Sequence, residues 1–288
     1  MNTKELLKKV RKIEIKTRRL SDNIFGGEYL SAFKGKGMAF SEVRQYQYGD
    51  DIRTIDWNVT ARQSQPHIKV FEEERELTMM LAIDVSGSKN FGTKNYLKSE
   101  FVTEIAATLA FSANQNNDKV GLILFSDKVE LYIPPKKGRS HVLRIIRELI
   151  EFKPTSKKTS INEALRFLSS VLKKRSILFI FSDFIDNDYE QNLNILSKRH
   201  DVTGCRVYDK AEMEIPNLGL VQMVDQESGE VLLINTGFSK VRNRYIKQQK
   251  LFVSYFENSF KKSGGGNISF RTDDNYVRKL LGYFKKRG

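Results

Sequence analysis

Residues 77–88, "LTMMLAIDVSGS", join an unbroken apolar run to a polar end in which Asp84, Ser86 and Ser88 alternate with small residues. A continuous apolar run of this length is typical of a strand that is buried on both faces, as in a parallel sheet. The polar end could be a plain loop exit, a turn that presents a nucleophile, or a set of oxygen ligands for a hard cation. The stretch therefore predicts a core strand, and the rest of the chain must decide between the three interpretations of its end.

Strand and helix patterns alternate from residue 77 onward. This alternation predicts an α/β fold with a mostly parallel sheet and helices on both faces. Residues 128–134 alternate in hydropathy and stop at two prolines, which predicts an antiparallel edge strand. The other predicted strands are 119–126, 176–183, 201–209 and 267–271, and the predicted helices are 94–116, 139–152, 160–174, 188–199, 240–262 and 274–286.

The first 76 residues do not follow the alternation. We therefore expect an appended segment at 1–76, which begins with a basic helix, and a main domain at 77–288. Residues 219–235 contain two short apolar runs around a Glu-Ser-Gly turn, which predicts a β-hairpin insertion near 218–236.

The net charge of +14 is concentrated at the two ends of the chain. Residues 1–20 carry a net charge of +6 and residues 239–288 carry +10, around a nearly neutral centre. Such ends are expected either to be solvated helix faces or to attract an anionic partner. Within residues 1–20, Leu6, Val10, Ile13 and Leu20 form an approximate stripe that could pack on the main domain or lie in a membrane interface.

The single cysteine, Cys205, excludes an internal disulfide and a multi-thiolate metal site. We expect no secretory signal and no membrane-spanning segment, because charged residues interrupt every apolar stretch. The expected location is the cytoplasm, with peripheral contact at the inner membrane as a further possibility.

Two more oxygen-bearing side chains are predicted at the same edge of the sheet as Asp84. Asp183 ends the apolar run at 176–183, and Thr159 lies in the loop before a predicted helix. Ligands of open α/β sheets bind at the carboxyl ends of the strands. Together with Asp84, Ser86 and Ser88, these residues form a set of hard oxygen donors that suits Mg²⁺ or Mn²⁺.

The pattern Asp-x-Ser-x-Ser at 84–88, followed by Thr159 and Asp183, resembles the metal-ion-dependent adhesion site of von Willebrand factor A domains. The resemblance implies that Ser86, Ser88 and Thr159 contact the metal directly and that the two aspartates act largely through coordinated water. Many members of that family have two glycines before the threonine, where this chain has Lys157 and Lys158. These lysines could weaken metal binding or contact an acidic partner.

Catalytic interpretations of this edge lack a base. A serine nucleophile needs a neighbouring base, and none of the three histidines ends a predicted core strand. A phosphorylated Asp84 is conceivable, but the glycines near residue 35 form no phosphate-binding loop. We therefore expect no catalytic residues. The histidines are His67, His141 and His200.

Residues 37–76 concentrate paired acids and arginines around Trp57, the only tryptophan. An ion-pair and hydrogen-bond network is the simplest interpretation of the charges, with Trp57 as an anchor against the main domain. The stretch "GDDIRTIDWNVTAR" at 49–62 resembles the hallmark of a bacterial family, the domain of unknown function 58, over roughly residues 20–286. The residues that carry this resemblance are Arg44, Asp50, Asp51, Arg53, Asp56, Trp57 and Arg62.

The family resemblance implies association rather than catalysis. Members are expected to work with a MoxR-type AAA+ ATPase and with other von Willebrand A proteins, some of them membrane-associated, in the assembly or maturation of client complexes. The expected role is therefore a non-enzymatic adaptor that uses a Mg²⁺ or Mn²⁺ site. The alternatives are a Mg²⁺-dependent phosphatase or hydrolase, and membrane-surface or nucleic-acid binding through the basic ends, although no specific nucleic acid is expected.

Overall fold

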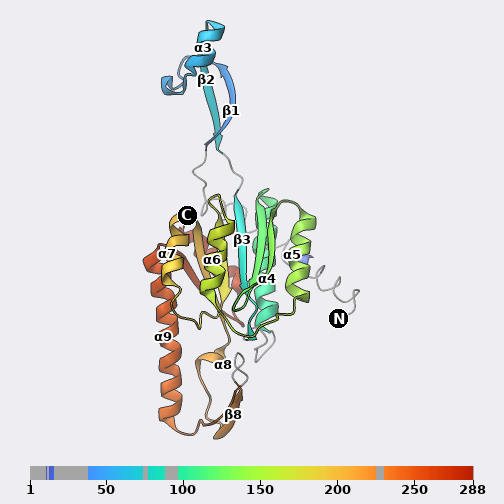
Figure 1. The fold of residues 1–288 in the computed structure, drawn as a ribbon, viewed down its shortest axis with the longest axis vertical. Helices are drawn as coiled ribbons and strands as arrows, with labels where there is room; N and C mark the ends of the chain where they lie inside the picture. The colour runs from blue at the N-terminus through green and yellow to red at the C-terminus, as the bar shows by residue number, and fades with distance from the viewer. Residues whose placement is uncertain are drawn as a thin grey trace. The chain divides into compact units, whose positions relative to one another are not determined.

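A computed structural model describes residues 11, 13–15, 38–73, 77–87, 97–224 and 230–287 of the protein (Figure 1). The chain divides into two compact units, one formed by residues 33–76 and the other by residues 77–288 together with residues 1–32. The predicted division at residue 76 assigned the first 32 residues to the appended segment, whereas the structure groups them with the main unit. One described contact explains this grouping, because Arg139 donates a hydrogen bond of 2.7 Å to Glu14.

A six-stranded sheet forms the centre of the main unit, in the order β10-β7-β6-β3-β4-β5. All neighbours are parallel except β4 and β5, so the predicted fold class and the antiparallel edge strand are both confirmed. The strands are β3 (Thr78–Asp84), β4 (Lys119–Phe125), β5 (Val129–Lys136), β6 (Ile177–Ser182), β7 (Asp201–Tyr208) and β10 (Gly266–Arg271).

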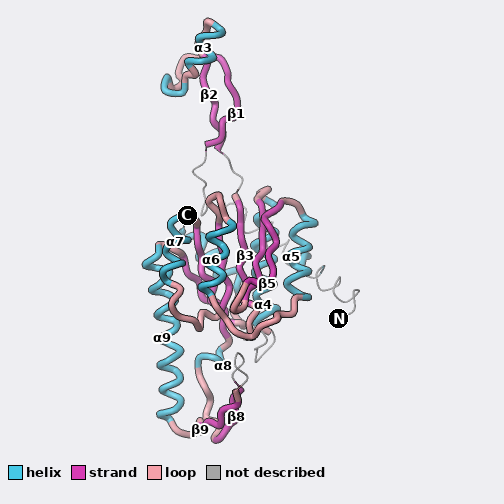
Figure 2. Tube along the Cα trace, in the orientation of Figure 1, coloured by secondary structure: helices cyan, strands magenta, loops and turns pink. Residues whose placement is uncertain are grey.

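Helices cover both faces of this sheet. On one face, side chains such as Met80 and Ile180 belong to a buried cluster with residues of α6, α7 and α9. Figures 1 and 2 show α6 and α7 over the near side of the strands. On the other face, the ring of Phe179 packs edge-on against Phe284 of α10, with 6.4 Å between centroids. The helices are α4 (Lys98–Gln115), α5 (Arg139–Glu151), α6 (Ile161–Val171), α7 (Glu190–Arg199), α9 (Ser239–Ser263) and α10 (Tyr276–Arg287).

The apolar run that ends at Asp84 forms the central strand β3. Its middle residues are buried on both faces because β4 and β6 flank it and helices cover both sides. The basic carboxyl-terminal helix α10 buries Tyr276, Leu280 and Phe284, so one side of it belongs to the core and only the other can meet a charged partner.

The predicted hairpin insertion consists of β8 (Leu220–Val224) and β9 (Val231–Asn235), which pair antiparallel apart from the main sheet. It follows a short helix, α8 (Lys210–Met213), which the sequence patterns did not predict. Within the described part of the chain, no helix combines the length and hydropathy needed to cross a bilayer.

The unit at residues 33–76 contains a second, unpredicted hairpin. Strands β1 (Met38–Gln45) and β2 (His67–Glu73) pair antiparallel, and η1 (Ile52–Thr54) and α3 (Trp57–Gln63) lie between them in the sequence. The charge content of this segment concealed the strands, because their alternation is carried by few apolar residues. The predicted stripe of residues 1–20 lies outside the described residues except at Ile13.

Candidate metal site at the carboxyl edge of the sheet

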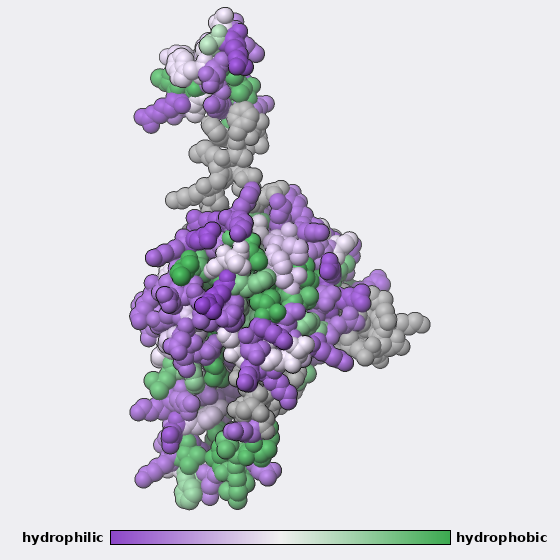
Figure 3. Space-filling model, viewed as in Figure 1, coloured by the Kyte–Doolittle hydropathy of each residue, from purple (hydrophilic) through white to green (hydrophobic). Residues whose placement is uncertain are grey.

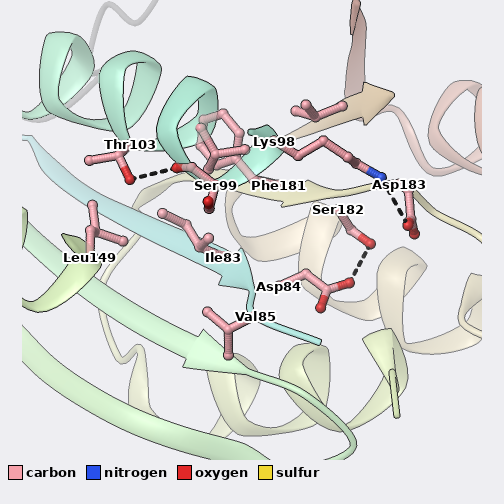
Figure 4. A pocket seen from close by; sticks show the side chains of 12 residues that line it. Ile83, Asp84, Val85, Lys98, Ser99, Thr103, Leu149, Phe181, Ser182 and Asp183 are labelled. Carbon is pink, nitrogen blue, oxygen red and sulfur yellow. Dashed lines mark hydrogen bonds and ion pairs between the residues drawn. The ribbon is translucent and has the colours of Figure 1, made fainter. Parts of the chain in front are cut away.

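The two predicted aspartates lie at the ends of neighbouring parallel strands. Asp84 is the last residue of β3, Asp183 directly follows β6, and the register pairs Ile83 with Phe181. The hydroxyl of Ser182 donates a hydrogen bond of 2.8 Å to Asp84 Oδ2 (Figure 4). The strand pairing therefore places Asp84 and Asp183 at one edge of the sheet, as predicted from the ends of the two apolar runs.

The loop after β3 folds back onto Asp84. The backbone N–H of Ser86 donates a hydrogen bond of 2.9 Å to Asp84 Oδ1, and Ser86 is almost completely buried. Ser88 lies outside the described residues. Burial and the neighbouring charge of Asp183 raise the pKa of Asp84 to about 7. Two acidic groups thus share a region that favours a compensating cation.

The loop that carries Thr159 lies against the loop that follows β3. Gly87 N–H donates to Lys157 O at 2.9 Å, and Ser160 N–H donates to Ser126 O at 2.9 Å. Ser160 then begins α6 as its N-cap, because its hydroxyl accepts a hydrogen bond from Glu163 N–H. Thr159 is partly buried in this loop, next to the segment that carries Asp84 and Ser86.

Glu130 of the edge strand β5 holds the Thr159 loop from the other side. Its carboxylate accepts hydrogen bonds from the Ser126 hydroxyl at 2.7 Å, Thr155 N–H at 2.7 Å and Ser156 N–H at 3.1 Å. Burial opposes ionisation, but these hydrogen bonds outweigh it and hold the pKa of Glu130 below its usual range. Nothing local in the sequence marks Glu130 for this role, since its two backbone donors are 25 and 26 residues away.

Asp186 fixes the start of α6 in a similar way. Its Oδ2 accepts a hydrogen bond of 2.8 Å from Ile161 N–H. The loop after β6, which contains Asp183, is thereby tied to the helix that follows Thr159. Asp186 is three residues beyond Asp183 and could have been suspected from the run "SDFID", but its partner is visible only in the fold.

A buried lysine, which the sequence analysis missed, is the most unexpected feature of this edge. Lys98 Nζ lies 2.7 Å from Glu212 Oε1 and 3.4 Å from Asp183 Oδ2, and the side chain is 5% exposed. Burial lowers the pKa of Lys98, but the charges of Asp183 and Glu212 outweigh this and raise it. Figure 4 shows Lys98 reaching Asp183 across a cavity whose other walls include Ile83, Phe181 and Val207.

The donor set fits a hard divalent cation that keeps part of its water shell. Among the described residues, no group of three or more His, Cys, Asp or Glu side chains is placed to hold a metal. A cation here would therefore depend on Asp84 and Asp183, on the hydroxyls of Ser86 and Thr159, and on water, which suits Mg²⁺ or Mn²⁺. The direct contacts of Ser86, Ser88 and Thr159 with a metal remain predictions.

Three neighbouring lysines modify this site. The side chains of Lys157 and Lys158 are exposed, so they are available to solvent or to a partner. Lys98, in contrast, is buried and already neutralises part of the charge of Asp183. A divalent cation would therefore meet a less negative site than the two aspartates alone would provide.

The two histidines of the main unit are placed away from this edge. His141 of α5 bonds through Nε2 to Val120 O at 2.9 Å, near the amino end of β4. His200 precedes β7 and is buried, so it lies at the opposite, amino edge of the sheet. His67 belongs to the other unit. We therefore still expect no serine–histidine pair at this edge, because neither histidine of the main unit lies there.

Comparison with known proteins identifies the family. The model of the family described as "Protein of unknown function DUF58" matches residues 42–251. The chain belongs to this family. An uncharacterized protein of Mycobacterium tuberculosis (strain H37Rv) is 26% identical over 281 residues, which cover 96% of this chain and 88% of that protein.

Two solved structures are similar to this DUF58 chain, and the first of them shares its α/β fold. An aerotolerance-related membrane protein from Bacteroides fragilis superposes with a TM-score of 0.50 at 17% identity, over 73% of this chain and 99% of that one. The SpRpn10 VWA domain gives a TM-score of 0.39 at 11% identity, over 72% of this chain and 94% of that one.

The signature segment of this DUF58 chain uses its charges structurally. Arg44 forms two hydrogen bonds, of 2.7 and 2.8 Å, with Asp50, which lower the pKa of that carboxyl. Asp51 caps η1, and Asp56 caps α3 and lies 3.3 Å from Lys69. These acids therefore order the connection between β1 and β2.

The remaining residues of the signature face outward in the structure. Arg53 and Arg62 are exposed, Trp57 is 70% exposed and Tyr48 is fully exposed. Trp57 is thus not part of a core within its own unit, and its predicted role as an anchor against the main domain stays a prediction.

Proposed function

We propose that this protein is a non-catalytic interaction module that binds an acidic side chain of a partner through a divalent cation. Asp84, Ser86, Ser88, Thr159 and Asp183 would hold the cation, and Mg²⁺ or Mn²⁺ is the proposed metal. A bound divalent cation with an unfilled coordination position supplies a directional electrostatic contact to a carboxylate. Lys157 and Lys158 are proposed to contact the same acidic partner.

The observation that carries this proposal is the placement of Asp84 and Asp183 at neighbouring strand ends, with a hydroxyl-bearing loop beside them. The two histidines of the main unit lie elsewhere in it, and a site of carboxylates and hydroxyls without a base favours binding over turnover. The family and the fold support a protein-interaction role. The proposed partners are a MoxR-type AAA+ ATPase and membrane-associated von Willebrand A proteins, and the proposed setting is the cytoplasm.

Calorimetric titration of the full chain with MnCl2 and with MgCl2 tests the metal. We expect saturable binding that Asp84→Asn and Ser86→Ala abolish. Asp273→Asn is the matched control, because Asp273 is exposed, pairs with Arg271 and follows β10, which β7 and β6 separate from β3. Equal binding by the wild type, Asp84→Asn and Ser86→Ala would contradict the proposed site.

Capture of a purified MoxR-type ATPase from the same organism, with and without EDTA, tests the partner. We expect EDTA and Asp84→Asn to weaken capture to a similar extent. Capture that neither change affects would remove the metal from the mechanism. Hydrolysis of p-nitrophenyl phosphate with Mn²⁺ that depends on Asp183 would favour the phosphatase alternative.

A further inference from the structure

The base of the β8–β9 hairpin presents a group of apolar side chains to solvent. Leu218, Leu220, Leu233 and Phe238 are each more than 60% exposed. Leu220 pairs with Asn235 and Gln222 pairs with Leu233, so Leu220 and Leu233 are diagonal neighbours on one face of the hairpin. These four residues are called the basal patch below.

Hydrogen bonds hold the basal patch in a fixed position at the start of α9. Buried Thr236 donates its N–H to Gly219 O at 2.7 Å, and its hydroxyl accepts from Leu218 N–H at 2.9 Å. Arg242 of α9 donates to the carbonyls of Thr236 at 2.6 Å and of Gly237 at 3.0 Å. The exposure of the patch is therefore a property of an ordered junction, not of a frayed end.

A cationic helix face adjoins the basal patch. Lys240, Arg244 and Lys247 are exposed at helical spacing along the first turns of α9, so they share one face. From residue 231 to residue 256 the sequence contains five Lys or Arg residues and no Asp or Glu. Figure 3 shows hydrophobic side chains gathered over the hairpin end of the molecule, with hydrophilic ones over the adjacent part of α9.

We propose that the basal patch and this face of α9 form a peripheral binding surface for an anionic phospholipid bilayer. Exposed aliphatic and aromatic side chains enter the interface while neighbouring Lys and Arg contact lipid phosphates. The hairpin, α8 and the start of α9 extend together beyond the end of the sheet (Figure 1), so the patch lies at one end of this unit.

Exposed apolar side chains beside cationic residues favour an anionic lipid surface, and the charge distribution defines which end of the hairpin makes contact. In the sequence, the segment that links β8 to β9 carries Asp225, Glu227 and Glu230, which anionic lipid would repel, whereas the base adjoins the cationic first turns of α9. The contact is therefore assigned to the base of the hairpin. This assignment narrows the sequence-based alternative, which placed membrane contact at residues 1–20 and 239–288, to the first turns of α9, and adds the apolar base of the hairpin.

Co-sedimentation of the full chain with vesicles tests the surface. Vesicles of phosphatidylcholine mixed with phosphatidylglycerol are compared with vesicles of phosphatidylcholine alone, at physiological ionic strength. We expect binding to the anionic vesicles only, and a loss of at least about tenfold in the double variants Leu220→Glu/Leu233→Glu and Lys240→Glu/Arg244→Glu. All four residues are exposed, so both variants should keep the wild-type melting temperature.

Two double variants on α7 match these changes in charge. Gln191→Glu/Ile195→Glu adds two negative charges on an exposed face, and Lys198→Glu/Arg199→Glu reverses two positive charges. We expect both to bind anionic vesicles nearly as well as the wild type. If the α7 variants lose as much vesicle binding as the hairpin and α9 variants, binding depends only on the net charge of the protein, and the proposal is overturned.

Three other outcomes also overturn it. In the first, the wild type does not bind anionic vesicles. In the second, Leu220→Glu/Leu233→Glu binds them as well as the wild type does. In the third, sedimentation velocity shows a dimer that this variant dissociates, which would assign the patch to a second copy of the chain. None of these results depends on a metal, so they are separable from a failure of the proposed function.

Discussion

Lys98 and Glu212 form an ion pair of 2.7 Å between residues 114 positions apart in the sequence. The pair joins the first turn of α4 to α8, and the same ammonium lies 3.4 Å from Asp183 at the candidate metal site. Tyr245 of α9 also donates a hydrogen bond of 2.9 Å to the carbonyl of Glu212. The buried ammonium group of Lys98 therefore connects the edge of the candidate metal site to the segment that leads to the hairpin insertion.

Lys98→Met should destabilise the fold and make it more dependent on divalent cations. Removing one partner from a buried ion pair leaves uncompensated charge, which costs about 3–5 kcal/mol of unfolding free energy. Because Asp183 also loses its neighbouring positive charge, MnCl2 should raise the melting temperature of the variant more than that of the wild type. Urea unfolding and thermal denaturation with and without MnCl2 measure both effects.

Lys262→Met is the control for this experiment. Lys262 is 70% exposed and lies 3.9 Å from Glu190, so its loss should change stability by less than about 1 kcal/mol. If Lys98→Met changes the unfolding free energy no more than Lys262→Met does, the buried ion pair does not stabilise the fold as predicted.

Glu130→Gln should lower stability in a pH-dependent manner. The pKa of Glu130 is lower in the folded state than in the unfolded state, where it is about 4.3. Its carboxylate therefore stabilises the fold above the unfolded-state pKa. This stabilisation is lost as the pH falls through the lower, folded-state pKa. We expect a deficit of about 1–3 kcal/mol at neutral pH, because two backbone donors of the Thr159 loop lose a charged acceptor.

Chemical denaturation of both proteins across the acid range checks this expectation. The stability curves of wild type and variant should converge at low pH. Glu163→Gln serves as the control, since Glu163 is exposed and pairs only at the surface with Arg166. A deficit that is constant with pH would show that the charge of Glu130 is not the cause.

Gly204→Ala should destabilise the main unit by about 1–3 kcal/mol. A Cβ atom on Gly204 of β7 would lie 2.5 Å from the Phe260 ring and 2.7 Å from the Phe256 ring, so α9 would have to move away from the sheet. Gly282→Ala in α10 is the matched control, because a Cβ there meets nothing within 4 Å. Its expected effect is a stabilisation of about 1 kcal/mol from helix propensity. Similar unfolding curves for the two variants would contradict the packing argument.

The thiol of Cys205 should be unreactive in the folded protein. Burial raises the pKa of Cys205 well above its ordinary value, so little thiolate forms even in mildly alkaline solution. Ellman's reagent should label one thiol per chain promptly in guanidinium chloride and only slowly, through transient opening, without it. Rapid labelling of the native protein would mean that β7 is accessible, contrary to the buried strand seen here.

The alternating apolar runs and helical spacings were sufficient to predict the parallel sheet and its antiparallel edge. Local hydropathy reports burial directly, and the ends of two such runs also placed Asp84 and Asp183 at one edge. The strands β1 and β2 escaped prediction because Arg44, Asp50 and their neighbours hide a hairpin within a charged segment. Helix α8 escaped because four residues are too few to show a period.

By itself, then, the sequence determined the layers of the fold and the candidate oxygen ligands. Only the tertiary structure decided which charged side chains support these ligands. Lys98 forms an ion pair with Asp183, and Glu130 accepts hydrogen bonds from the loop that carries Thr159. Lysines and glutamates are abundant at protein surfaces, so nothing local marks the few that are buried. The pairing depends on contacts between residues 25 to 114 positions apart, which only the folded chain brings within hydrogen-bonding distance.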